Sequence, residues 1–182
     1  MFMSGVVPGG GVGAARIVRV TVAAALSLGF WVLPTGYAKS EGAVKDKHGN
    51  WETRCETPPG AASEQCAIVQ SVADQERPNI TLVVIALKTA DRKSRLLRVI
   101  APLKVLLPTG MGLRVDKDDM GRMSFVRCLP NGCVAEVFID DKLLAKMESG
   151  QTITFVIFET PEEGIGVPAP LAGFKESFEA LP

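Results

Sequence analysis

Four cysteines are the residues in this sequence best suited to chemistry, and they stand at Cys55, Cys66, Cys128 and Cys133. Thiols form disulfides, bind zinc or cycle as a redox pair. The cysteine spacings do not match a zinc motif, and the sole histidine, His48, stands apart from them. Thiol oxidoreductases typically use Cys-x-x-Cys at a helix N-terminus, whereas four residues across an expected turn separate the last two cysteines. An even number of cysteines in an exported domain therefore predicts disulfides.

The local spacing favours bridges between Cys55 and Cys66 and between Cys128 and Cys133, among the three pairings that four cysteines allow. In the second pair, strand-like residues flank the sequence Leu-Pro-Asn-Gly over residues 129–132. Proline suits the second position of a β-turn, asparagine the third and glycine the fourth. A four-residue loop of this kind sets the flanking cysteines opposite each other on neighbouring strands, close enough to bridge.

Other patterns that would indicate catalysis or metal binding fail on residue type. A serine nucleophile would need His48 as its base, and no Gly-x-Ser-x-Gly elbow is present. Residues 116–121 resemble the start of a calcium loop, but Met120 occupies a ligand position and Arg127 replaces the bidentate glutamate. The acidic pair at 162–163 follows a proline and precedes a glycine, which is typical of a hairpin turn. The sequence therefore predicts no enzyme, with no catalytic residue, metal site or cofactor.

Residues 1–38 have the three-part layout of a secretory signal peptide. They contain no acidic residue, and their only charges are Arg16 and Arg19. An apolar run of 14 residues, Val20–Leu33, follows these arginines. A permanent membrane anchor would need about 20 residues to cross the hydrocarbon core, so a cleaved signal is the favoured interpretation.

The small residues Gly36 and Ala38 place the expected cleavage between Ala38 and Lys39. All 20 acidic residues but only 18 of the 20 Lys and Arg residues follow this point, so the mature chain has a formal net charge of −2. Nucleic-acid-binding proteins usually carry a basic patch or stripe, and this charge balance argues against such a partner. Contact with a membrane is expected only through the signal peptide, before its removal.

Short strands separated by turn residues dominate the mature chain. Residues 80–87, Ile-Thr-Leu-Val-Val-Ile-Ala-Leu, are nearly all apolar and β-branched, as in a strand buried on both faces. Residues 151–158 instead alternate between apolar and polar side chains, which predicts one buried face. Such strands favour an antiparallel sandwich or barrel. The expected strands are Trp51–Cys55, Cys66–Val72, Ile80–Leu87, Leu96–Ile100, Leu113–Val115, the two strands of the Cys128–Cys133 hairpin, and Gln151–Phe158.

Two segments have helical patterns. Asp140 or Asp141 can cap a short helix, which Gly150 can end. Over Leu171–Leu181, apolar residues recur at helical spacing and form one stripe that we expect to pack on the sheets.

The domain organisation follows from length and composition. The 182 residues predict one main domain, and their hydrophobic content of 47% is enough for a packed core. Residues 39–49 are polar and are expected to form a flexible N-terminal arm. The folded domain is expected over residues 50–182.

Several short motifs follow one another in a characteristic order. They are Trp51 with Cys55 and Cys66; Ala-Pro-Leu-Lys-Val-Leu-Leu-Pro-Thr-Gly over 101–110, running to Leu113 and Asp116; Phe-Val-Arg-Cys over 125–128; Asn-Gly-Cys-Val-Ala over 131–135; and Leu-Ala-Gly-Phe over 171–174 before Phe178 and Leu181. In this order, over about residues 50–181, they resemble the invasion-associated locus B family of alphaproteobacteria. One departure is Lys104, where the resemblance leads us to expect glycine; we expect it to affect a turn or strand edge.

The resemblance implies an immunoglobulin-like antiparallel β-sandwich with one or two short helices and two disulfides. It places the protein in the periplasm, in the outer envelope or outside the cell, and links it to bacterial entry into host cells. We therefore expect a non-enzymatic protein that acts by binding an unknown protein or envelope partner. The alternative is a periplasmic structural or chaperone-like factor with only indirect effects on invasion. The candidate binding segments are Glu56–Glu64, Thr109–Gly112 and Glu159–Ala169.

Overall fold

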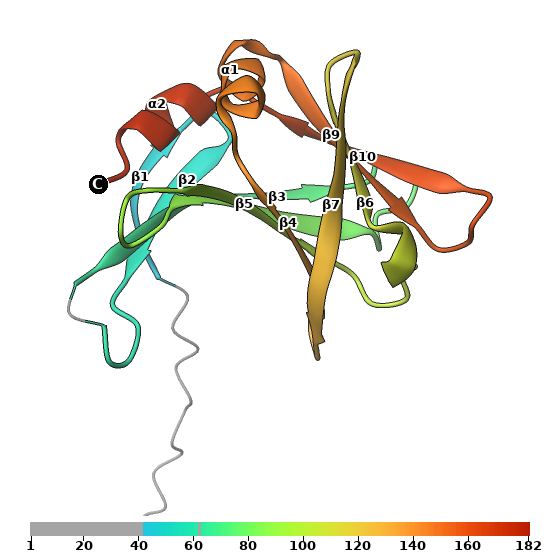
Figure 1. The fold of residues 1–182 in the computed structure, drawn as a ribbon, viewed down its shortest axis with the longest axis horizontal. Helices are drawn as coiled ribbons and strands as arrows, with labels where there is room; N and C mark the ends of the chain where they lie inside the picture. Colours follow the sequence, from blue (N-terminus) through green and yellow to red (C-terminus); the bar gives the residue numbers. More distant parts are fainter. Residues whose placement is uncertain (1–41, 62) are drawn as a thin grey trace, which may run out of the picture. The chain divides into compact units, whose positions relative to one another are not determined.

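The computed structural model describes residues 42–61 and 63–182 (Figure 1). The predicted signal peptide, residues 1–38, and its cleavage between Ala38 and Lys39 lie outside the described residues. The strands of the described part are β1 Ala43–His48, β2 Trp51–Glu56, β3 Gln65–Ala73, β4 Thr81–Lys88, β5 Arg95–Ala101, β6 Met111–Val115, β7 Asp118–Leu129, β8 Gly132–Phe138, β9 Thr152–Phe158 and β10 Gly164–Pro170. Its helices are α1 Asp141–Ser149, α2 Phe174–Glu179 and the 3₁₀ turn η1 Leu107–Thr109.

The strands form one continuous antiparallel ladder that divides into two layers at β7. The strand order is β1-β2-β3-β4-β5-β8-β7-β6-β9-β10. The first half of β7 pairs with β6, and its second half pairs with β8. One layer therefore holds β1 to β5, β8 and the end of β7, and the other holds β6, β9, β10 and the start of β7. The predicted antiparallel β-sandwich with two disulfides is confirmed.

The core lies between the layers and under the helices. Ile153, Phe155 and Ile157 on β9 are fully buried, as the alternating pattern of residues 151–158 predicts. Helix α2 covers the inner face of the first strands, where the Phe174 ring packs edge-on against Trp51 with centroids 5.3 Å apart. The predicted apolar stripe of residues 171–181 is confirmed, because Leu171, Phe174, Phe178 and Leu181 are all buried.

Helix α1 begins and ends where the sequence places it. The Asp140 side chain accepts a hydrogen bond from the backbone N–H of Leu143 at 2.7 Å, which makes Asp140 the N-cap. Gly150 is the C-cap, and its backbone N–H donates to the Lys146 carbonyl. Within the described residues, neither helix is long and apolar enough to cross a membrane.

Two segments differ from the prediction. The flexible arm expected over residues 39–49 is wrong for its larger part, because Ala43–His48 forms β1 and pairs with β2. The side chains of β1 are mostly exposed, so backbone hydrogen bonds rather than apolar burial define this strand. The sequence also did not indicate β10, whose Ile165, Val167 and Ala169 are buried while the glycines and prolines between them are exposed.

The departure at Lys104 falls in a turn, as the resemblance leads us to expect. Lys104 lies between β5 and η1, and its φ of 76° is in the left-handed region. Glycine adopts this region without the Cβ clash that other residues incur, which explains an expected glycine at this position.

Candidate functional site

The two disulfides are cross-strand bridges. Cys55 pairs with Cys66 across β2 and β3, and Cys128 pairs with Cys133 across the β7–β8 hairpin. The Glu64 carboxylate lies within 4.8 Å of both sulfurs of the first bridge. Because metal ligation by cysteine needs a free thiolate, these bonded sulfurs hold strands together and do not form a metal site.

The acidic run at 116–119 has structural roles in the β6–β7 turn. The Asp116 carboxylate accepts hydrogen bonds from the backbone N–H groups of Gln151 and Thr152, at 3.2 and 3.0 Å. Asp118 forms an ion pair with Lys146 of α1, and this hydrogen bond lowers the pKa of Asp118 below its ordinary value. The run therefore ties the exposed start of the β6–β7 hairpin to α1 and to the start of β9.

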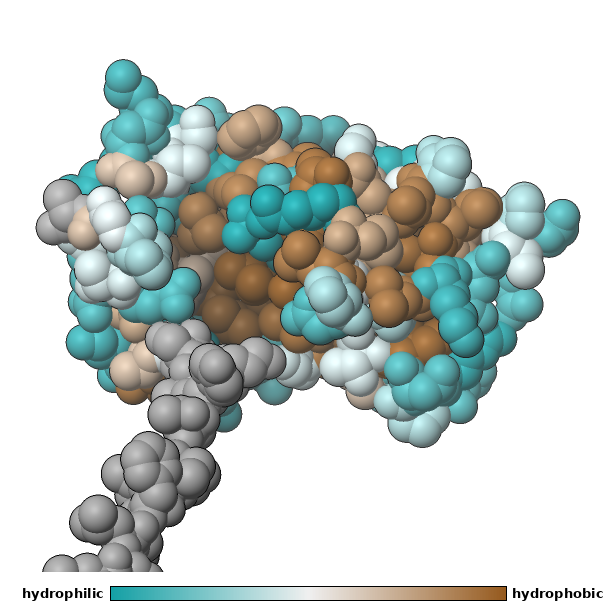
Figure 2. All heavy atoms as spheres, turned by 90° about the horizontal axis from the view of Figure 1, so that it is seen from below, coloured by the Kyte–Doolittle hydropathy of each residue, from teal (hydrophilic) through white to brown (hydrophobic). Residues whose placement is uncertain are grey.

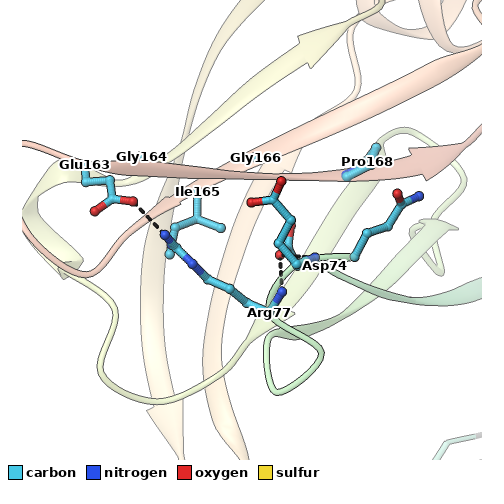
Figure 3. Close-up of a pocket in the computed structure, with 9 residues that line it drawn as sticks. Asp74, Arg77, Glu163, Gly164, Ile165, Gly166 and Pro168 are labelled. Atoms are coloured by element: carbon cyan, nitrogen blue, oxygen red, sulfur yellow. Dashed lines mark hydrogen bonds and ion pairs between the residues drawn. The ribbon is translucent and has the colours of Figure 1, made fainter.

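A polar pocket lies between the β3–β4 loop and the start of β10 (Figure 3). Its volume is about 400 Å³, and it includes part of the predicted segment Glu159–Ala169. Across it, the Arg77 guanidinium donates to the Glu163 carboxylate at 2.6 Å, which raises the pKa of Arg77. The Asp74 carboxylate accepts from the backbone N–H of Arg77 at 2.7 Å. These groups pair with one another at an exposed surface, so their charges hold the β3–β4 loop against the start of β10.

A second surface carries a different chemistry. In Figure 1, α1 and α2 lie on one side of the strands β2 to β5, and the other side of these strands is not covered by a helix. Directly opposed residues in an antiparallel ladder point to the same face. The register aligns Leu87 with Leu96, and Leu96 with Phe138, on this uncovered side. We call this surface the outer face, and its apolar side chains are Ala67, Val69, Val83, Ile85, Leu87, Leu96, Ile100, Val134, which is itself buried, and Phe138.

Figure 2 views this side of the molecule and shows a broad hydrophobic area interrupted by hydrophilic side chains. Most of the apolar side chains are half-buried by their neighbours, while Phe138 at the edge is 68% exposed. Four strands at about 4.8 Å spacing and five residues at about 3.3 Å rise cover on the order of 300 Å² of sheet. The largest apolar patch of a soluble monomer is typically about 300–600 Å² and is often a functional surface.

Two ion pairs lie on the outer face. Near its middle, Arg98 of β5 donates to Glu136 of β8 at 2.6 Å, and both side chains are largely shielded from solvent, at 32% and 24% exposure. On the β2 side, Arg54 donates to Glu52 at 3.0 Å. The face thus combines apolar side chains with two ion pairs, Arg98–Glu136 and Arg54–Glu52.

The outer face is also hollowed over β2 to β5. A depression of about 320 Å³ lies there. Both apolar and charged side chains line it. The lining residues include Arg54, Ala67, Val69, Ile85, Leu87, Lys88 and Arg98.

The apolar run of residues 80–87 is the sequence feature that corresponds to this surface. The apolar run of residues 80–87 predicts burial on both faces, whereas only one alternate set, Ile80, Leu82, Val84 and Ala86, is buried. The outward Val83, Ile85 and Leu87 are only partly covered within the described chain. The loop Glu56–Glu64 and the turn Thr109–Gly112 lie at the ends of strands. The loop contributes Glu56, Ser63 and Glu64 to surface depressions, and the turn contributes Gly112.

Comparison with known proteins gives a consistent picture. The sequence model of the family described as "Invasion associated locus B (IalB) protein" matches residues 51–182. Two invasion protein B homologs, from Brucella abortus strain 2308 and from Brucella abortus biovar 1 strain 9-941, are each 27% identical over 84 residues. This match covers 46% of the chain and spans about half, 49%, of each relative.

Among solved structures, the fold is similar to the crystal structure of invasion associated protein B from Bartonella henselae. The TM-score is 0.61 at 18% sequence identity. The match covers 74% of this chain and 92% of the solved one. At this identity the likeness supports the fold.

Proposed function

The chain belongs to the invasion associated locus B family, and on that premise we propose that it is a non-enzymatic exported envelope protein that acts by binding a protein partner through its outer face. The observation that carries the proposal is the uncovered apolar surface across β3, β4, β5 and β8. Removing such side chains from water is favourable in proportion to the apolar area covered, which gives the surface a physical reason to bind. The family name connects such binding with invasion, and we include support of host-cell invasion in the proposal.

Binding explains the surface better than catalysis does. The polar pocket beside β10 has charged groups that are exposed and paired with each other, as for Arg77 and Glu163. A catalytic site needs groups whose proton affinity or nucleophilicity is tuned for reaction, typically by burial and unequal neighbours. The outer face instead has an apolar centre with an exposed aromatic residue, Phe138, at its edge, which is a common composition of protein interfaces.

A specific partner is also favoured over a chaperone-like role toward many clients. Proteins that bind many partners use flexible surfaces rich in methionine or loops, which repack around each partner. The outer face is built on paired β-strands and contains no methionine among its apolar side chains. Its central Arg98–Glu136 pair adds a fixed pattern of charge that only a complementary surface satisfies.

Export to the periplasm or beyond fits the same proposal. Disulfides persist in oxidising compartments such as the bacterial periplasm, and two are present here. The sequence of residues 1–38 supplies the features of a cleaved signal peptide.

Photo-crosslinking in growing cells tests this function. A photoreactive phenylalanine analogue in place of Phe138 should form covalent adducts with a protein partner upon irradiation, because this side chain lies on the proposed interface. The matched control places the same analogue at Leu107, which is 43% exposed and belongs to η1 and not to a strand of the outer face. Adducts at 138 and not at 107 are the expected result. Absence of adducts at 138, or equal yields at both positions, would contradict binding through the outer face.

A further inference from the structure

The charge pattern at the middle of the outer face is self-complementary. Arg98 and Glu136 are direct cross-strand neighbours, so a positive and a negative group stand side by side within apolar surroundings. A two-fold axis parallel to the sheet, running along the strand direction over the midpoint of this pair, would bring Arg98 of each copy against Glu136 of the other. The result is a square of alternating charges in which every group has opposite neighbours.

We propose that the outer face binds the same face of a second copy of this chain, forming a two-fold symmetric dimer. The inference rests on the proposed function, because it names the occupant of that same face. In a two-fold dimer a single surface supplies both halves of the interface, so it must complement itself in both charge and polarity. The outer face meets this condition, because its apolar rows Ala67–Leu87–Leu96–Phe138 and Val83–Ile100 lie on either side of the charge pair.

The paired charges also distinguish a second copy from a membrane surface. Anionic lipid attracts clusters of unneutralised Lys and Arg. Here Arg98 is bound by Glu136 and Arg54 by Glu52, so these guanidinium groups on the face are already matched by carboxylates. Such a face has little to gain from lipid headgroups. In a dimer, Arg98 and Glu136 of one copy keep their mutual ion pair, and each gains an opposite charge from the second copy. The second partner limits the free-energy cost of removing these charges from water.

Sedimentation of the mature chain, residues 39–182, tests the dimer across a range of concentrations. The unmodified chain should sediment as a dimer that dissociates on dilution. Arg98→Glu makes all four central groups negative, and Glu136→Arg makes them all positive. Each variant alone should therefore weaken association by about 100-fold or more, a typical effect for close charge pairs at interfaces. Leu107→Glu, a charge placed on an exposed residue outside the face, should leave the association unchanged.

Mixing the two charge variants separates a lost interface from a damaged fold. In the mixture, the negative centre of Arg98→Glu meets the positive centre of Glu136→Arg, so a mixed dimer should form although neither variant associates alone. Circular dichroism establishes that both variants are folded before mixing. A monomeric unmodified chain, or folded variants that fail to associate when mixed, would overturn the second-copy inference.

The crosslinking experiment distinguishes failure of the dimer from failure of the proposed binding function. Adducts at position 138 that contain two copies of this chain support both. Adducts with a different envelope protein, together with a monomeric mature chain, overturn the dimer and leave binding through the outer face intact. The absence of any adduct overturns both.

Discussion

At the residue scale, Gly49 and Gly173 stand where the turn after β1 and the turn before α2 pass so close to each other that neither position has room for a Cβ. A Cβ on Gly173 would lie 2.0 Å from the His48 carbonyl oxygen, and one on Gly49 would lie 2.3 Å from the Ala172 carbonyl oxygen. Both glycines have positive φ, at 85° and 55°. The backbone N–H of Asn50 donates to Ala172 at 3.1 Å across the same contact. The Leu-Ala-Gly-Phe motif at 171–174 therefore fixes how the last helix joins the β1–β2 hairpin.

Gly173→Ala should lower the free energy of unfolding by about 3 kcal/mol or more, because backbone atoms must move apart in addition to the left-handed strain. Gly121→Ala is the matched control: its φ is 94°, but nothing lies within 4 Å of the added Cβ. It should cost only about 1–2 kcal/mol, the strain of the backbone alone. Urea denaturation followed by circular dichroism measures both values. Equal losses in the two variants would show that the contact with His48 does not matter.

At the element scale, strands with one buried face and helices with clear caps were predictable, because local side chains define them. The strand over 151–158 and the helix after Asp140 are examples. β10 was not predictable in the same way, since glycine and proline usually mark turns. Pro168 and Pro170 are tolerated there because β10 is an edge strand, where a missing N–H costs no ladder hydrogen bond.

β1 is a second strand that the local sequence does not predict. Its residues are mostly charged and exposed, a composition that predicts a flexible arm. Its backbone nevertheless pairs with β2 over Ala43–His48. Charged side chains on an edge strand are common because they discourage pairing with other chains. The apolar inner row of β2, rather than the composition of β1, positions the hairpin.

The disulfides belong to the same scale, since each bridges neighbouring strands. Mass mapping of the unreduced protein should link Cys55 only to Cys66 and Cys128 only to Cys133. The sequence separations of 11 and 5 residues imply loop-closure contributions of about 3 and about 2 kcal/mol to the free energy of unfolding. Replacing each pair by serine and measuring urea denaturation checks this order. A crossed pairing in the mass map would contradict the register of both hairpins.

At the scale of the whole molecule, the sandwich depends on β7, a strand that serves both layers. It passes from β6 to β8 as its partner between Met123 and Ser124, and its pairing with β8 shifts register just beyond, between Phe125 and Arg127. Such bulges bend a strand and increase its twist, which lets one ladder fold over itself. No local pattern in the sequence indicates this change of partner, because it depends on contacts far apart in the chain.

The outer face was accessible to prediction only in part. The apolar run over 80–87 shows that β4 has apolar side chains on both faces, but not which neighbours stand beside them. The register of β3, β5 and β8 is what joins these side chains into one surface and places Arg98 against Glu136. A functional surface made of rows across strands, rather than of a motif along the chain, has no compact sequence signature.

The central claim is that the outer face is covered by a partner in the cell. Carbene footprinting of intact cells, compared with the dilute purified mature chain, tests it most directly. Labelling of Leu87 and Phe138 relative to Leu107 should fall several-fold in cells, whichever protein covers the face, because a bound partner excludes the reagent. The same labelling ratio in cells and in dilute solution would contradict the claim.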